Sequence, residues 1–166
     1  MSPRDQINRM IKWLFLPAMT VFLFAAFATS ALAQETHTIT LFVNTAEVNS
    51  RNTDAQCNFG QGAGVSNEEF TIDARVGDII VWKGVSTNAP DTDIVSISAI
   101  NHEGGVNIFD QNTLRGNGQF PEVVIGTVVQ GAPGDEEKYK LSFKVFNGDR
   151  QRNGTFHIDP KIRIVP

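Results

Sequence analysis

The 166-residue sequence has only one cysteine and three methionines, and this scarcity excludes several classes of protein. Cys57 has no second cysteine with which to form an internal disulfide, so packing alone must stabilise the fold. The methionines are Met1, Met10 and Met19, all close to the N-terminus. The rest of the chain therefore lacks the thioether that a blue-copper centre usually adds to two imidazoles and a thiolate.

Motifs that carry hydrolytic chemistry are also missing. The chain has no G-x-S-x-G elbow to present a nucleophilic serine, and its histidines show neither H-x-H nor H-E-x-x-H spacing. Cys57 has no basic neighbour to favour its thiolate, so inert burial is a better interpretation than catalysis with His102 or His157. We therefore expect a protein that is not an enzyme and uses no cofactor.

Positive charge is scarce over most of the chain. Of 14 basic and 18 acidic residues, three basic residues and one acidic residue lie in the first 33, which leaves 11 against 17 and a net charge of −6. Such a surface repels phosphate backbones and anionic lipids, so we expect neither nucleic acid nor membrane as a partner. The partners that remain possible are an unidentified ligand, another protein or a second copy of the chain.

The N-terminus has the pattern of a secretory signal peptide. Basic residues precede an apolar run over 13–27, which leads to the cleavage motif Ala31-Leu32-Ala33. We predict cleavage after Ala33, which separates a signal peptide over 1–33 from one domain over 34–166 in the periplasm or outside the cell. The alternative is an uncleaved anchor, since a spanning helix needs about 20 residues, but the cleavage motif favours removal.

Alternating hydrophobicity predicts short strands throughout the mature chain. Apolar residues take every second position in 38–44, 69–74 and, most clearly, 138–146, where they alternate with lysines. Weaker runs add strands at 78–83, 94–100, 106–109, 123–129, 155–158 and 161–165. Turn-forming residues separate these runs, and no helical periodicity follows the signal. The pattern indicates an all-β fold, an antiparallel Greek-key β-sandwich of immunoglobulin-like or cupredoxin-like type.

One stretch resembles the cupredoxins. VGDIIVWKG, residues 76–84, is similar to the start of a cupredoxin strand. That family places a thiolate, an imidazole and a thioether near its last strand, but the corresponding stretch here, 139–164, has His157 alone. The resemblance therefore implies the fold and not the copper site.

A second resemblance covers nearly all of the mature chain. The stretches ITLFVNTAEV (39–48), VGDIIVWKG (76–84), YKLSF (139–143) and GTFHIDPKIRI (154–164) occur in the order expected for the AidA/PixA inclusion-body protein family. The resemblance implies a small β-sandwich with an Asp-Pro-x-Ile ending and no assigned enzymatic activity. The expected signal peptide departs from this family and argues against an intracellular inclusion role.

Loops at the ends of such a sandwich are the expected binding surface. The long segments 44–68 and 110–121 are the main candidates, with Arg115 and Phe120 as anchors in the second. His102 and Glu103, in a glycine-bounded loop, are further candidate binding residues. The function we expect is that of an exported, non-catalytic domain that binds a ligand or partner through these loops.

Self-assembly into a homo-oligomer is the first alternative. An edge strand such as 138–146, or the strand that follows Pro160, can pair with a second copy. The lysines on 138–146 oppose such pairing.

A metal site for calcium, zinc or a degenerate copper centre is the second alternative. Asp91 with Asp93, or Asp135 with Glu136, offers carboxylates for calcium, and His102 is the candidate imidazole. The regular D-x-D-x-D-G pattern is missing, so solvated loop charges are the simpler interpretation.

Overall fold

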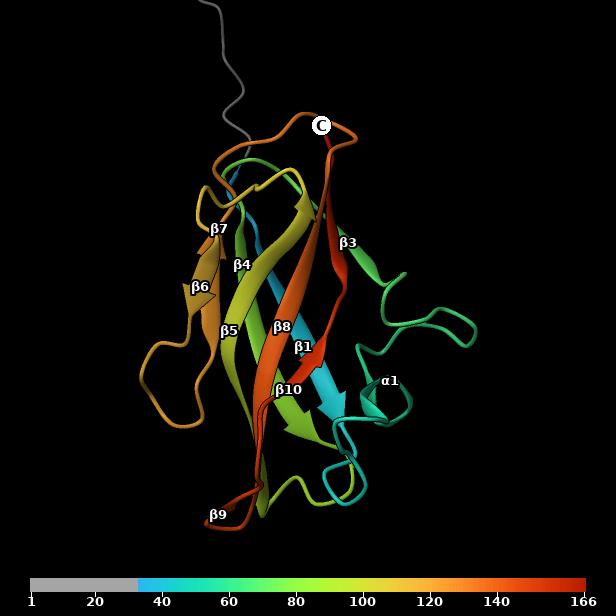
Figure 1. The fold of residues 1–166 in the computed structure, drawn as a ribbon. Helices are drawn as coiled ribbons and strands as arrows, with labels where there is room; N and C mark the ends of the chain where they lie inside the picture. The colour runs from blue at the N-terminus through green and yellow to red at the C-terminus, as the bar shows by residue number, and fades with distance from the viewer. Residues whose placement is uncertain (1–32) are drawn as a thin grey trace, which may run out of the picture. The chain divides into compact units, whose positions relative to one another are not determined.

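A computed structural model describes residues 33–166, and strands dominate this range (Figure 1). The elements are β1 (Thr36–Val43), α1 (Thr53–Gln56), β2 (Cys57–Asn58), β3 (Thr71–Ala74), β4 (Ile79–Ser86), β5 (Asp93–Gly105), β6 (Thr113–Arg115), β7 (Val124–Thr127), β8 (Glu136–Asn147), β9 (Arg150–Gln151), β10 (Phe156–Ile158) and β11 (Lys161–Ile164). No helix within 33–166 is long and apolar enough to cross a membrane. The signal peptide predicted for 1–33 lies outside the described residues, apart from Ala33.

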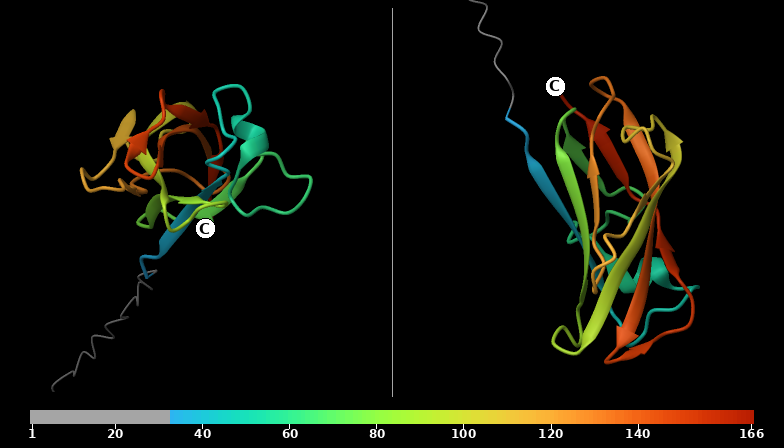
Figure 2. Two further views of the ribbon diagram at one scale, coloured as in Figure 1. Left: turned by 90° about the horizontal axis from the view of Figure 1, so that it is seen from below. Right: turned by 90° about the vertical axis from the view of Figure 1, so that its left-hand side faces the viewer.

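The strands form two sheets that together confirm the all-β prediction. One sheet has the order β2-β1-β4-β7, and the other has the order β3-β11-β8-β5-β6, with β9 and β10 also paired to β8. The long strands β5 and β8 lie across from β1 and β4, as in a β-sandwich (Figures 1 and 2).

The prediction of purely antiparallel sheets is wrong at two places. β1 runs parallel to β4 from Thr36↔Ile79 to Val43↔Ser86, and β11 runs parallel to β3. Parallel neighbours need a long crossover connection. The segment between β1 and β4 supplies one because it passes through β3 in the other sheet.

Most of the predicted strands are present, and the exceptions have local causes. No strand forms over 106–109, because the chain turns at Gly105 with a φ of 77° while Ile108 and Phe109 still reach the core. The additional strands β2, β6 and β9 have two or three residues each. Alternation cannot be recognised over so short a length.

The core lies between the two sheets and is centred on aromatic side chains. Trp82 of β4 and Tyr139 of β8 are fully buried, and their rings meet edge to face at 5.7 Å. The alternating apolar residues Tyr139, Leu141, Phe143 and Val145 of β8 are buried, as their pattern predicts, while its lysines and Phe146 stay partly exposed. Burial raises the pKa of the Tyr139 phenol, which therefore stays protonated.

Candidate functional site

The segment between β1 and β3 contains only α1 and the two-residue strand β2 (Figure 1). The rings of Phe59 and Phe70 stack with their centroids 4.6 Å apart, and this contact joins the middle of the segment to its end. The buried Asn67 side chain donates to the carbonyl oxygens of Asp54 at 3.1 Å and Cys57 at 3.0 Å. These contacts fix the shape of a segment that has almost no regular secondary structure.

An open cavity of about 480 Å³ lies in this segment, and we call it the loop cavity. Residues 54–55, 57–58 and 61–68 line it. The lining side chains include the carboxylates of Asp54 and Glu68, the amides of Asn58 and Gln61, and the hydroxyl of Ser66. Gln61 is held in place because its amide donates to Asn67 Oδ1 at 2.8 Å. The cavity therefore presents oriented polar groups on a fixed frame.

Cys57 is one of the residues that line the loop cavity, and its thiol is free and buried. Burial raises the pKa of this thiol to about 12, and the negative charge of Asp54 acts in the same direction. A thiol with so high a pKa stays protonated near neutral pH, so Cys57 is a poor nucleophile and a poor metal ligand.

His102 and Glu103, the candidate binding residues, lie on β5 and not in a loop, and their side chains have different polar partners. His102 Nδ1 lies 3.4 Å from Oε1 of the buried Glu137, whose Oε2 accepts the Ile108 N–H at 2.9 Å. Burial raises the pKa of Glu137 despite these contacts. Glu103 pairs with Lys140 instead, which lowers the pKa of that carboxyl. The structure therefore does not join His102 and Glu103 in one site.

The residues proposed for calcium or zinc lie apart. Asp93 accepts hydrogen bonds from Thr45 at 2.6 Å and Asn147 at 2.7 Å, which lower the pKa of its carboxyl. Asp91 is exposed in the preceding turn. Nine positions of β5 separate Asp93 from His102, roughly 30 Å at about 3.3 Å per residue, so the two cannot bind one ion.

The second carboxylate pair also has no convergent geometry. Asp135 accepts the N–H of Ala132 at 2.7 Å within its own turn, and Glu136 starts β8. Over 33–166, no group of three or more His, Cys, Asp or Glu side chains is placed to hold a metal ion.

Arg115 and Phe120 do not line the loop cavity. Arg115 ends β6 and is exposed. Phe120, in the loop that follows, is 61% exposed and meets the ring of Phe146 edge to face at 4.8 Å. Phe120 is therefore a surface residue packed on the outside of β8.

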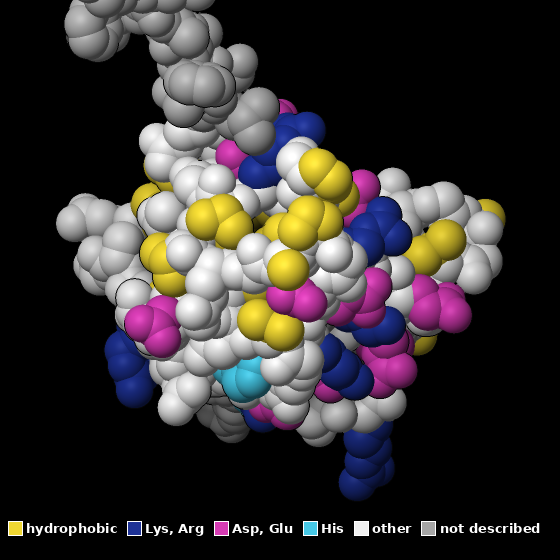
Figure 3. Space-filling model, turned by 90° about the horizontal axis from the view of Figure 1, so that it is seen from above, with side chains coloured by type: hydrophobic (Ala, Val, Ile, Leu, Met, Phe, Trp, Pro, Cys, Tyr) yellow, Lys and Arg dark blue, Asp and Glu magenta, His cyan; other side chains and the backbone are white. Residues whose placement is uncertain are grey.

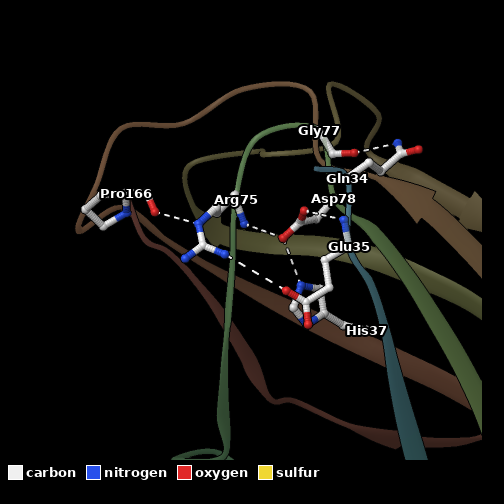
Figure 4. Close-up of polar contacts among 7 residues, drawn as sticks. All are labelled: Gln34, Glu35, His37, Arg75, Gly77, Asp78 and Pro166. Carbon is white, nitrogen blue, oxygen red and sulfur yellow. Dashed lines mark hydrogen bonds and ion pairs between the residues drawn. The ribbon is translucent and has the colours of Figure 1, made fainter. Parts of the chain in front are cut away.

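Sequence reasoning missed a polar cluster where β1 begins (Figure 4). The carboxylate of the buried Asp78 accepts the N–H groups of Glu35 at 3.0 Å and Arg75 at 2.8 Å, and lies 2.8 Å from His37 Nε2. Burial acts to raise the Asp78 pKa, but the contacts with His37, Arg75 and Glu35 outweigh it, and the pKa is lowered. We call these four residues the Asp78 cluster.

A hydroxyl–imidazole pair on β8 and β10 was also missed. Ser142 Oγ lies 3.0 Å from His157 Nδ1, across paired positions of the two strands. Among the described residues, no carboxylate pairs with His157 to orient it. The pair therefore lacks the third member of a hydrolytic triad.

The fold resembles a solved structure of an inclusion body protein. No family model and no curated relative matches the sequence. The crystal structure of the inclusion body protein PixA from Burkholderia cenocepacia J2315 superposes with a TM-score of 0.59, at 13% identity, over 82% of this chain and 99% of that chain. The resemblance to the AidA/PixA family predicted from the sequence is thus confirmed at the level of the fold.

One end of the fold exposes apolar side chains (Figure 3). Val76 and Val129 are each 51% exposed. They are brought together because Gly77 N–H donates to the Val128 carbonyl at 2.8 Å and Val128 N–H donates to the Asp78 carbonyl at 2.9 Å. The start of β1 is therefore bordered by an apolar surface.

Proposed function

We propose that this chain is an exported, non-catalytic β-sandwich protein of Greek-key, cupredoxin-like type that binds a small polar ligand in the loop cavity. The observation that carries the proposal is the cavity itself, a polar recess fixed by Asn67 and by the Phe59–Phe70 stack. Loops positioned by a rigid scaffold commonly carry binding functions. The signal-peptide pattern supports export.

The lining supports a ligand that carries both hydroxyl groups and a positive charge. The cavity has two carboxylates, from Asp54 and Glu68, and no basic side chain in its lining. Lys138 lies 3.8 Å from Glu68, so Asp54 is the carboxylate better placed to meet an ammonium group. The Asn58 amide nitrogen offers donors for ligand hydroxyls, and the two carboxylates offer acceptors, whereas the Gln61 amide is engaged by Phe59 N–H, Val65 and Asn67. A small amine of the amino-sugar class combines these features.

Isothermal titration calorimetry with glucosamine and glucose tests the proposal. A charge-assisted hydrogen bond contributes about 1.5–3 kcal/mol, so glucosamine is expected to bind at least about tenfold more tightly than glucose. Asp54→Asn should remove this difference, because it removes the charge and keeps the shape. Asp91→Asn is the matched control at an exposed loop position outside the cavity. Absence of binding, or an equal loss in the control, would overturn the proposal.

A further inference from the structure

β1 has one open edge over most of its length. On one side it pairs with β4 from Thr36 to Val43. On the other side β2 pairs with it at Phe42 and Val43 alone, and no other strand within 33–166 joins it there. In the right-hand view of Figure 2, β1 (blue) accordingly lies at the margin of its sheet.

Alternate residues of β1 turn their backbone groups toward this open side. The carbonyl oxygens of Glu35 and Val43 accept bonds from Ile79 and Thr87 N–H at 2.8 Å, so odd-numbered positions face β4. Asn44 N–H donates in the opposite direction, to Gln56 on the β2 side. The N–H and C=O groups of Thr36, Thr38 and Thr40 therefore point outward from the sheet edge.

This edge lacks the features that usually prevent strand pairing. Sheet edges are normally protected by charges, proline, bulges or very short strands. β3 and β6 have four and three residues and carry Asp73 and Arg115. β1 has eight residues, no proline and no bulge, and its outward side chains are threonines followed by Phe42. Its one ionisable side chain, His37, is bound to Asp78.

The Asp78 cluster holds this edge in a fixed position (Figure 4). Asp78 binds the backbone of Glu35 and the side chain of His37, one residue on either side of Thr36. Gln34 adds a bond to the Gly77 carbonyl. A strand held in place before association loses less conformational freedom on pairing than a frayed one.

We propose that the β1 edge binds the β1 edge of a second copy of this chain, antiparallel, across a two-fold axis at Thr38. Thr38 then faces the partner's Thr38, and Thr36 faces the partner's Thr40. Each such pair of facing residues exchanges two backbone hydrogen bonds, about six bonds in all. An isologous contact of this kind joins two four-stranded sheets into one.

Two observations favour a second copy over a foreign peptide. The contact is free of charge on both sides, so it brings no like charges together although the mature chain carries a net charge of −6. It also ends where β2 begins, because Phe42, which pairs with Asn58, would lie opposite the partner's Gln34. Cross-strand threonine pairs are themselves favourable. The surface therefore complements itself.

Analytical ultracentrifugation of the secreted protein over a concentration series tests this inference. The wild type is expected to dimerise, and Thr38→Lys to raise the dimer dissociation constant at least tenfold, because it places two cations at the two-fold axis. Thr155→Lys, at an exposed threonine away from β1, should leave the constant unchanged. A wild type that is monomeric throughout, or a Thr38→Lys protein that still dimerises, would overturn the inference.

Cysteine crosslinking gives a second readout that keeps the strand intact. Facing residues in hydrogen-bonded pairs have Cα atoms about 5.5 Å apart, within the range that a disulfide spans. Thr38→Cys should therefore form a covalent dimer under mild oxidation, whereas Thr155→Cys and the wild type, with its buried Cys57, should not. Equal crosslinking of the two variants would contradict the proposed register. Ligand binding by the Thr38→Lys monomer remains a separate test of the loop cavity.

Discussion

Trp82 donates a hydrogen bond from its indole nitrogen to the Tyr139 hydroxyl at 3.0 Å, and this bond links the two sheets inside the core. Tyr139→Phe would keep the ring and leave the Trp82 N–H buried without a partner. We expect the free energy of unfolding to fall by about 1–3 kcal/mol, measured by urea denaturation. Thr155→Ala, at an exposed position, should change it by less than about 0.5 kcal/mol. An unchanged denaturation midpoint in Tyr139→Phe would show that the bond contributes nothing.

Asp78 should make the protein sensitive to acid. Its folded-state pKa is lowered, so its stabilisation is present above the unfolded pKa of about 3.9 and is lost as pH falls through the folded pKa. We expect the melting temperature of Asp78→Asn to be lower than that of the wild type at pH 7, and the difference to shrink as pH falls from about 4 through the folded pKa. Asp91→Asn is the control. A constant difference between Asp78→Asn and wild type at all pH values would contradict this interpretation.

Gly126 should not tolerate a larger side chain. A Cβ at this position would lie 2.6 Å from Leu114 Cδ1 and 3.0 Å from Phe109 Cε1. Gly126→Ala is therefore expected to destabilise the fold by about 1–3 kcal/mol through overpacking. Gly104→Ala is the matched control, since nothing lies within 4 Å of a Cβ there. Thermal unfolding of both variants distinguishes packing from a general effect of replacing glycine.

Cys57 should react slowly in the folded protein. With a pKa raised to about 12 and a buried side chain, its thiolate is scarce at pH 8. We expect iodoacetamide labelling, followed by intact mass, to be at least about a hundredfold slower than in urea. Thr155→Cys, whose added thiol is exposed, should label quickly under the same conditions. Rapid labelling of native Cys57 would revive the catalytic alternative.

The sequence predicts where strands form better than it predicts which strands pair with one another. β8 is evident because one face of it is buried, so apolar residues take every second position from Tyr139 to Val145. The parallel pairing of β1 with β4 is not evident, because pairing depends on contacts between residues far apart in the chain and leaves no local pattern.

The candidate sites, too, are predictable from the sequence only where they depend on residues close together in the chain. The sequence predicts 44–68 as a long loop, and the loop cavity lies within it. The Gly77-Asp78 turn is also visible, but the partners of Asp78 on β1, Glu35 and His37, lie 43 and 41 residues earlier. His102 and Glu103 are adjacent in the sequence, yet each binds a different residue of β8. Adjacency in the sequence is therefore a poor guide to a shared site on strands.

The parallel pairing of β11 with β3 has a consequence for the order of folding. β11 is the last strand, and Arg75, just after β3, donates to the Pro166 carbonyl 91 residues away. Contacts of such long range slow folding, because the loop must close before they form. A chain that is synthesised from its N-terminus cannot complete this sheet until β11 has been made. Until then, among the strands of residues 33–166, β3 has no partner in its sheet.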